Sequence, residues 1–229
     1  VTTIGPSAFA GKTNISSITI PSSVKTIGSK AFNGWTDSQT IILNCPLSVI
    51  MDTGASYNTR SPGFNSKGIF TSCEAKVEVK NTTVLKSIPS YAFYNWSGLK
   101  SIDLAVTINN IGSYAFSGCT SLELITIPSE VTKVSYGLFK GCTSLTSISL
   151  PNTITIIEGY AFSDCTSLST IKMPTSLTGI GEKAFKACAF TEVIIPNTVT
   201  SIGSNVFADC SRLTSCTLPN GLTSISSNL

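Results

Sequence analysis

The chain has 229 residues, only 12% of them are charged, and its formal net charge is +3. Lys12, Lys25 and Lys30 are separated by uncharged stretches, and the sequence has no basic run of the kind that follows a phosphate backbone. No stretch approaches the roughly 18 consecutive apolar residues that a membrane span requires. We therefore expect neither nucleic-acid binding nor membrane insertion by this segment.

A phenylalanine repeat runs through the sequence. Phe9 and Phe32 lie 23 residues apart, and the same step recurs along most of the chain. The later members of the series are Phe70, Phe93, Phe116, Phe139, Phe162, Phe185 and, one residue early, Phe207. A fixed period of this length indicates a solenoid of stacked units that share one continuous core. We expect about nine 23-residue repeats that form a single solenoid over residues 1–229.

Each repeat has the pattern of a short strand, a proline and a turn. In the unit that starts at Phe139, the apolar residues Leu145, Ile148 and Leu150 end in the alternation of a strand with one buried face. Pro151 then ends the strand, because proline has no amide hydrogen to donate. The phrase Ile-Gly-x-x-Ala-Phe-x-Gly follows and predicts a tight turn and a one-turn helical piece.

Nine strands follow from this pattern. Stacked about 4.8 Å apart, they predict one sheet roughly 40 Å wide. They are expected at Ile15–Ile20, Ser38–Leu43, Lys76–Asn81, Leu99–Leu104, Leu122–Ile127, Leu145–Leu150, Leu168–Met173, Phe190–Ile195 and Leu213–Leu218.

The position two residues after the phenylalanine is usually Gly, Asn or Asp. These residues best tolerate a left-handed backbone, as at a helix C-cap. Asn95, Gly118 and Asp164 are examples. Ser72 and Ala187 depart from the rule, so we expect locally altered turns at both.

The period breaks between Phe32 and Phe70, which lie 38 residues apart. The extra residues fall in the range 51–67, where glycine, proline and asparagine indicate a loop insertion. Insertions in solenoids leave from one edge of a coil and often carry binding. The alternative is a tolerated surface elaboration, which costs little stability.

The consensus Ile-Pro-x-x-Val-x-x-Ile-Gly-x-x-Ala-Phe-x-Gly-Cys-x-x-Leu-x-x-Ile is clearest in Ile127–Ile148 and Ile180–Ile195. It resembles the leucine-rich repeats of the BspA type, from Ile4 to Ile225, and departs from them around residues 51–69. The resemblance implies an α/β-type leucine-rich repeat solenoid, a right-handed coil with a parallel sheet on its concave face. It also implies a location outside the cell or on its surface, in a class often described as adhesins that bind host proteins or other cells.

Both ends of the chain fall inside a repeat. Val1 lies one strand before Phe9, and Leu229 lies one residue before the next phenylalanine is due. We therefore expect a segment of a longer array.

Six of the eight cysteines occur three residues after a repeat phenylalanine and predict a column of small buried hydrophobic side chains. They are Cys73, Cys119, Cys142, Cys165, Cys188 and Cys210. Trp35 and Trp96 take the same position in two coils, which disfavours a metal-binding or disulfide role. Two questions concern the other cysteines: Cys45 and Cys73 flank the insertion and could form a bridge, and Cys216 is expected to be buried. Because the chain also has no histidine, we expect no metal and no cofactor.

Two short motifs imitate sites of chemistry. Asp52-Thr53-Gly54 resembles an aspartic-protease loop, but those enzymes need two aspartates and the chain has no second copy of the motif. Gly11-Lys12-Thr13 resembles the end of a phosphate-binding loop, but Gly5 is one residue too far away for that motif. We expect no enzymatic activity.

The outward positions of the predicted sheet carry mostly short hydroxyl side chains, which suit extended or multivalent contact with another protein. Our candidate protein-binding residues are Thr126, Ser149, Lys172 and Ile194 on the sheet, and Tyr57, Arg60 and Phe64 on the inserted loop. The sequence thus predicts a secreted or cell-surface interaction module that adheres to host or neighbouring-cell proteins. The alternative is a structural spacer or stalk that displays another domain. The identity of the ligand and the oligomeric state stay open.

Overall fold

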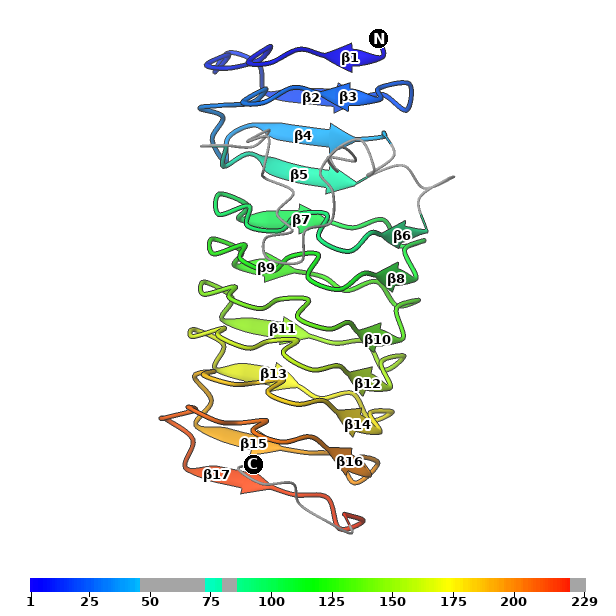
Figure 1. Ribbon diagram of the computed structural model, residues 1–229, viewed down its shortest axis with the longest axis vertical. Coiled ribbons are helices and arrows are strands. Elements are labelled where there is room, and N and C mark those ends of the chain that lie inside the picture. Colours follow the sequence, from blue (N-terminus) through cyan, green and yellow to red (C-terminus); the bar gives the residue numbers. More distant parts are fainter. Residues whose placement is uncertain (46–72, 80–85, 223–229) are drawn as a thin grey trace.

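A computed structural model describes residues 1–45, 73–79 and 86–222 of the chain. These residues form a stack of coils that follow one another along the long axis of the molecule (Figure 1). Every strand pairs in parallel with a strand of a neighbouring coil. The predicted solenoid is therefore confirmed. In the described part of the chain no helix is long and apolar enough to cross a membrane.

Each of the nine predicted strands is present. Eight are shorter than expected, and the last two residues predicted for the third lie outside the described residues. They are β2 (Ser17–Ile20), β4 (Thr40–Leu43), β5 (Lys76–Val79), β7 (Ser101–Asp103), β9 (Leu124–Ile125), β11 (Ser147–Ser149), β13 (Thr170–Lys172), β15 (Glu192–Ile194) and β17 (Ser215–Thr217). We call them the long strands. They stack in one column, but their hydrogen bonding divides them into sheets of five, two and two strands instead of one sheet of nine.

Eight further strands of two residues each were not predicted. They are β1 (Thr3–Ile4), β3 (Thr26–Ile27), β6 (Ser87–Ile88), β8 (Asn110–Ile111), β10 (Lys133–Val134), β12 (Ile156–Ile157), β14 (Gly179–Ile180) and β16 (Ser201–Ile202). The short strands from β6 onward form a column of their own at the right of the stack, beside the column of long strands (Figure 1). The second residue of each is buried, so the Ile-Gly phrase starts with a strand and not with a turn. The expected α/β character is wrong for the described residues, which contain strands and turns and no helix.

The predicted helical piece is instead a turn segment, defined here as the five residues centred on the repeat phenylalanine. In residues 114–118, the amides of Tyr114, Phe116 and Gly118 donate to carbonyl oxygens of the next coil at 3.0, 3.0 and 2.7 Å. Other coils repeat the pattern, so the turn segments are joined by a backbone ladder of their own. The first and last residues of each segment have positive φ, which aims their amides along the stack.

The left-handed positions after the phenylalanine are confirmed, with φ of 56° at Asn95, 76° at Gly118 and 63° at Asp164. The expected altered turn at Ala187 is wrong. Ala187 has φ of 58° and donates its amide to Ala208 at 2.8 Å, like its counterparts in other coils. The bond between coils therefore overrides the intrinsic preference of alanine. Ser72 lies outside the described residues.

The repeat phenylalanines form the centre of the core. Adjacent described rings stack with centroids 5.2 to 5.7 Å apart and planes within 15° of parallel. Such stacked pairs contribute about 0.5–1.5 kcal/mol beyond the burial of their area. Each ring thus covers the next, and a coil without neighbours would leave its phenylalanine exposed on both faces.

The extra residues at the period break lie on both sides of β5, whereas the prediction placed all of them before it. Val77 pairs with Ile41 on one side and with Ile102 on the other. It lies 36 residues after Ile41 and 25 before Ile102, so thirteen extra residues precede β5 and two follow it. Counting from the phenylalanines would place Glu78 opposite Thr40 and Ser101. In the structure it lies opposite Ile42 and Asp103, two positions further along each strand.

The predicted cysteine column is confirmed for Cys119, Cys142, Cys165, Cys188 and Cys210, whose thiols also donate hydrogen bonds. The prediction is wrong for Cys73, which is buried but lies level with Gly98, two positions from Trp96, because of the register between β5 and β7. The thiol of Cys119 donates to the carbonyl oxygen of Phe93 in the preceding coil at 3.0 Å. The thiols of Cys142, Cys165, Cys188 and Cys210 repeat this bond to Phe116, Phe139, Phe162 and Phe185. Trp35 replaces cysteine because its indole Nε1 makes the same bond to Phe9 at 2.8 Å. The Trp96 indole donates to Cys73 in the same way, at 3.0 Å.

Burial keeps these thiols neutral. It raises the pKa of Cys165 to about 12, and it raises the pKa values of Cys45 and Cys73 to about 11. Cys45 and Cys73 are both free, so the bridge between them is absent. The expectation for Cys216 is wrong, because Cys216 is exposed. Its strand β17 has a bonded neighbour, β15, on one side only among the described strands.

A first prediction concerns the glycine that follows five of the eight short strands. A Cβ on Gly181 would lie 2.4 Å from the backbone nitrogen of Gly159, whereas a Cβ on Gly5, at the same repeat position, would meet nothing within 4 Å. We expect Gly181→Ala to lower the free energy of unfolding by at least about 2 kcal/mol, because two coils must move apart. Gly5→Ala should change it by less than about 0.5 kcal/mol. Equal effects of the two in urea denaturation would contradict this account of the glycine.

A second prediction concerns Ala187, which carries the steric cost of a left-handed backbone. Ala187→Gly should raise the free energy of unfolding by about 1 kcal/mol, because the strain removed exceeds the added entropy of the unfolded chain. Ala184 is buried, has no positive φ and serves as the control. Ala184→Gly should be destabilising, and a destabilised Ala187→Gly protein would show that residue 187 is not strained.

A third prediction concerns the thiols. In the native protein at about pH 8, a thiol reagent should modify Cys216 alone, and all eight cysteines should react after unfolding. The raised pKa values also make the folded state hold protons that the unfolded state releases. The stabilisation is therefore complete below the ordinary thiol pKa of about 8.5 and is lost as the pH rises above it. Rapid labelling of a second cysteine in the native protein, read by mass spectrometry, would contradict the prediction that the buried cysteines are inaccessible to the reagent.

Candidate functional site

The four candidate residues on the long strands are all exposed. Ser149 and Lys172 lie directly opposite each other on β11 and β13, and Ile194 lies opposite Thr217 on β15 and β17. Thr126 follows the end of β9 by one residue. The structure thus brings Ser149 and Lys172 together and places Ile194 in a different hydrogen-bonded sheet. Tyr57, Arg60 and Phe64 lie outside the described residues.

The surface of the long strands is polar, with isolated apolar side chains. Leu124 and Ile194 are each 63% exposed, but they lie on β9 and β15, and β11 and β13 separate them in the stack. Lys100 bridges three coils at one edge, with its Nζ 3.2 Å from Asp37 and 3.3 Å from Glu74, and these hydrogen bonds raise the Lys100 pKa. The surface therefore offers spaced contacts and lacks one concentrated apolar centre.

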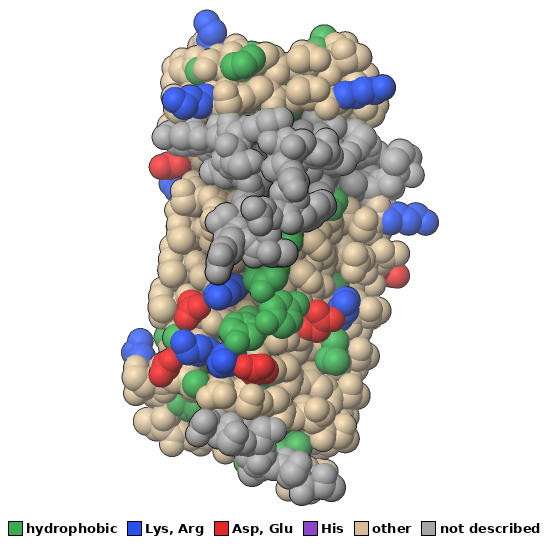
Figure 2. Space-filling model, in the orientation of Figure 1, with side chains coloured by type: hydrophobic (Ala, Val, Ile, Leu, Met, Phe, Trp, Pro, Cys, Tyr) green, Lys and Arg blue, Asp and Glu red, His purple; other side chains and the backbone are tan. Residues whose placement is uncertain are grey.

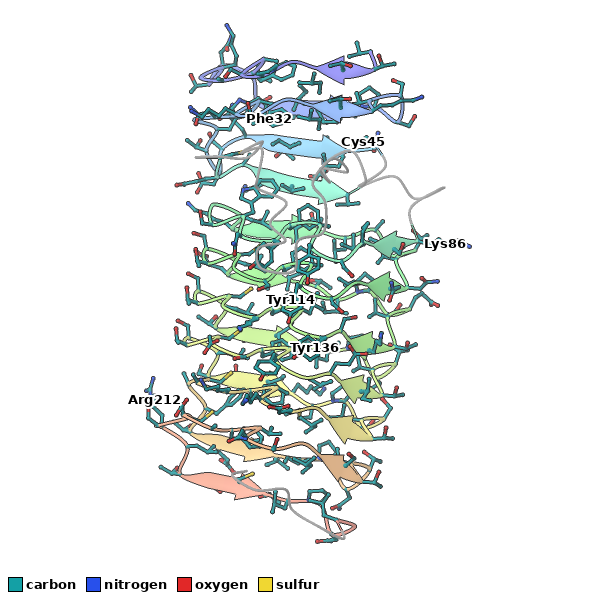
Figure 3. All side chains as sticks on the ribbon, viewed as in Figure 1. Phe32, Cys45, Lys86, Tyr114, Tyr136 and Arg212 are labelled. Atoms are coloured by element: carbon teal, nitrogen blue, oxygen red, sulfur yellow. The ribbon has the colours of Figure 1, made fainter. Side chains whose placement is uncertain are left out.

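A second surface consists of half-buried tyrosines from the turn segments together with the exposed Tyr136, which directly precedes one of these segments. We call it the tyrosine ladder, and its members are Tyr91, Tyr94, Tyr114, Tyr136 and Tyr160. The ring of Tyr114 stacks on that of Tyr91 with centroids 5.1 Å apart and planes 9° from parallel. Tyr136 lies 5.6 Å from Tyr114 and 5.4 Å from Tyr160. Figure 3 shows Tyr114 and Tyr136 in the middle of the stack, where Figure 2 shows hydrophobic side chains gathered on this face.

The backbone under this ladder is strained. Tyr91, Tyr114 and Tyr160 occupy the first, left-handed position of their turn segments, with φ of 62°, 58° and 57°. A left-handed conformation costs a non-glycine residue roughly 1–2 kcal/mol. Bulky side chains at positive φ are uncommon. The same position also has positive φ at Lys30, Lys183 and Asn205, so the strain is a property of the repeat. The chain therefore maintains three aromatic side chains at positions where glycine or asparagine would fit more easily.

Two of the rings pack directly against a glycine of the next coil, where a side chain would not fit. A Cβ on Gly137 would lie 2.4 Å from Cε1 of Tyr114, and a Cβ on Gly159 would lie 3.0 Å from Cε2 of Tyr136. Each ring thus rests close to the backbone of the next coil. These close contacts hold the two rings in fixed positions while 39% of Tyr136 stays exposed.

Charged side chains lie beside the ladder, and one of them, Lys140, places its Nζ 5.5 Å from the Tyr160 ring centroid. Lys183 places its Nζ 5.3 Å from the Tyr160 ring centroid, donates to the Tyr160 hydroxyl at 3.0 Å and pairs with Glu182 at 2.8 Å. On the other side, Lys133 pairs with Glu158 at 2.7 Å. The hydrogen bond to Lys183 lowers the pKa of Glu182. Figure 2 shows basic and acidic side chains on both sides of the apolar patch.

The raised pKa values of Tyr91 and Tyr114 keep these two phenol groups neutral. Burial is the largest cause of the raised pKa of Tyr114, which reaches about 12, and the neighbouring phenols Tyr136 and Tyr91 add to it. Burial also raises the pKa of Tyr91. Neutral phenols donate as well as accept hydrogen bonds, so this surface combines apolar rings with donors.

Sequence reasoning missed the tyrosine ladder. The available signal was the residue two before the phenylalanine, which is tyrosine at positions 91, 114 and 160. That position has no apolar periodicity of its own, because its side chains point away from the core. Only the stacking of coils shows that these tyrosines, together with Tyr94 and Tyr136, meet on one surface.

Comparisons with known proteins agree with this architecture. A crystal structure of a leucine-rich repeat protein from Bacteroides ovatus is 32% identical, with a TM-score of 0.67 over 97% of this chain and 54% of that one. A leucine-rich repeat protein from T. pallidum is 34% identical, with a TM-score of 0.54 over 58% of this chain and 63% of that one. This chain thus spans about half the length of the first of these proteins. A comparison with curated proteins gives no match.

The family comparison covers nearly the whole chain. The model of the BspA type leucine-rich repeat region matches in six copies, over residues 1–59, 66–146 and 132–229. The chain therefore belongs to the family of BspA type leucine-rich repeat proteins.

Proposed function

We propose that this chain is a non-catalytic interaction segment of a larger secreted or cell-surface protein, and that it adheres to host or neighbouring-cell proteins. The observation that carries the proposal is the pair of exposed surfaces on one rigid stack, the long strands and the tyrosine ladder. Membership of the BspA type family supports it, and so does the likeness to repeat proteins of Bacteroides ovatus and T. pallidum, of which the first is longer than this chain.

The stack suits this role because its side chains repeat at a fixed spacing. Ser149 and Lys172 are exposed in adjacent coils, and the hydrogen bonds of β11 and β13 hold them in register. Many modest contacts at fixed spacing add up when a partner is extended or repeated, because each contact after the first is intramolecular. An array of this kind binds through the number of its contacts more than through any single one.

A spacer is the second candidate, and the near-identity of successive coils favours it. The same regular stack that displays side chains would also hold another domain away from a surface. Deleting residues 139–161 removes one whole period and preserves the phenylalanine register. A spacer should tolerate this deletion, whereas an interaction segment should lose affinity.

The fourth prediction tests adhesion on the long strands. Purified chain should bind immobilised extracellular-matrix proteins saturably, and Ile194→Asp should weaken that binding about tenfold or more. Val106→Asp is the matched control, because Val106 is an exposed aliphatic residue outside the strands (76% exposed, against 63% for Ile194). Absence of saturable binding, or equal binding by chain lacking residues 139–161 and by every variant, would contradict adhesion and favour the spacer.

A further inference from the structure

We propose that the C-terminal end of the tyrosine ladder binds an acidic sugar, a pyranose that carries one carboxylate. The inference rests on the proposed function, because it gives the interaction segment one site and one class of ligand. The site consists of Tyr136, Lys140, Tyr160, Glu182 and Lys183. It requires neither the other members of the ladder nor the long strands.

Two lysines from neighbouring coils converge on the ring of Tyr160. The turn segment of Lys140 precedes that of Tyr160 in the stack, and the turn segment of Lys183 follows it. The Nζ of Lys140 lies 5.5 Å from the ring centroid, and the Nζ of Lys183 lies 5.3 Å from it. Both distances are within the roughly 6 Å of a cation–π contact. The ring therefore holds two ammonium groups at one place on the surface.

Lys140 keeps its charge available for a ligand. Lys133, Lys183 and Lys186 each pair with a carboxylate, whereas within the described ranges no salt bridge or side-chain hydrogen bond joins Lys140 to another residue. An aromatic ring attracts an ammonium group without neutralising its charge. The three N–H donors of Lys140 are therefore free to form a charge-assisted hydrogen bond with a ligand carboxylate.

Tyr136 presents an aromatic surface beside this charge. Its ring centroid lies 5.4 Å from that of Tyr160, and 39% of the residue is exposed. Gly159 lies against the ring, and the amide of Tyr136 donates to Glu158 at 2.8 Å, so the residue is held in place before any ligand binds. A fixed ring loses little rotamer entropy on binding. The C–H groups on one face of a pyranose suit the negative face of such a ring.

The hydrogen-bonding groups of the site suit a ligand that is rich in hydroxyls. Lys183 donates to the hydroxyl of Tyr160 at 3.0 Å and pairs with Oε1 of Glu182 at 2.8 Å. The second carboxylate oxygen of Glu182 has no hydrogen-bond donor among the residues that the structure describes. The site thus combines a free acceptor on Glu182 with free donors on Lys140, and a sugar hydroxyl can bond to either.

The same site disfavours a polyanion and an extended peptide. Glu158, Asp164 and Glu182 lie near the lysines and would repel a chain with many negative charges, and Figure 2 shows acidic side chains close to the apolar ones on this face. A peptide that adds a strand needs an open sheet edge, but alternate amides of these turn segments are already bonded to the next coil. One carboxylate among many hydroxyls is the chemistry that this mixture of charges fits.

The fifth prediction compares sialyllactose with lactose, which lacks the carboxylated sugar, by NMR titration of the full chain. We expect saturable binding of sialyllactose at millimolar concentration and about tenfold weaker binding of lactose, because lactose cannot form the bond to Lys140. A hyaluronan tetrasaccharide and its methyl ester make a second pair, in which the carboxylate belongs to a uronate. Binding of either acidic saccharide over its neutral counterpart supports the site and identifies the source of the carboxylate.

Variants assign the binding to named side chains. Lys140→Gln should weaken the binding of the acidic saccharide about tenfold, whereas Lys140→Arg should retain most of it because the charge remains. Lys25→Gln removes the same charge at an exposed position in the second coil and should bind normally. Tyr136→Ala should also weaken binding about tenfold, and Tyr136→Phe should weaken it less because it keeps the ring. Thermal unfolding of each variant shows whether the fold is intact.

Three results would overturn the acidic-sugar site: no binding of either acidic saccharide at millimolar concentration, equal binding of each acidic saccharide and its neutral counterpart, or unchanged binding by Lys140→Gln. Binding of a polyglutamate peptide in place of the saccharides would also overturn it and would assign the site to an acidic protein. If the saccharides fail while matrix-protein binding persists and remains sensitive to Ile194→Asp, the acidic-sugar site is wrong and the proposed function stands.

Discussion

Six of the described turn segments donate alternate backbone amides to carbonyl oxygens of the next coil, and the placement of most other residues follows from these bonds. The amides of Tyr114, Phe116 and Gly118 all point toward the same neighbouring coil. This arrangement requires left-handed backbone at both ends of the segment, and it places the phenylalanine side chain inward between them. The phenylalanine stack and the ladder of amides therefore stabilise the same contact between coils, one by ring packing and the other by hydrogen bonds.

The same constraint explains the residues that depart from the consensus. Ala187 adopts a positive φ because its amide must reach Ala208, and Trp35 substitutes for cysteine because the indole donates to the carbonyl oxygen of Phe9. A buried carbonyl oxygen left without its donor would cost roughly 1–3 kcal/mol. What each position preserves is thus a hydrogen bond between coils, and the identity of the side chain is secondary. The tyrosine ladder is an outward consequence, because the first residue of each turn segment has its backbone directed along the stack and its side chain directed to the surface.

Much of this fold could be predicted from the sequence, because long-period repeats convert spacing directly into position. The nine long strands, the left-handed residues such as Asn95 and the buried cysteines all followed from counting along the chain. The short strands did not, because two residues such as Lys133–Val134 are too few to show any periodicity. The register at β5 also failed, since the phenylalanine count cannot show that extra residues fall on both sides of Val77. For the site, counting found exposed residues such as Ser149 and Lys172. It missed the tyrosine ladder, which exists only where side chains of different coils meet.

The central claim, that the amide ladder of the turn segments holds the coils together, is tested most directly by native-state hydrogen exchange read by NMR. The account predicts that the amides of Tyr114, Phe116 and Gly118 exchange only by global unfolding, with the same opening free energy as the amides of β11. Exchange of these three amides through local opening, many times faster than the strand amides, would contradict the account and would leave the strands as the main link between coils.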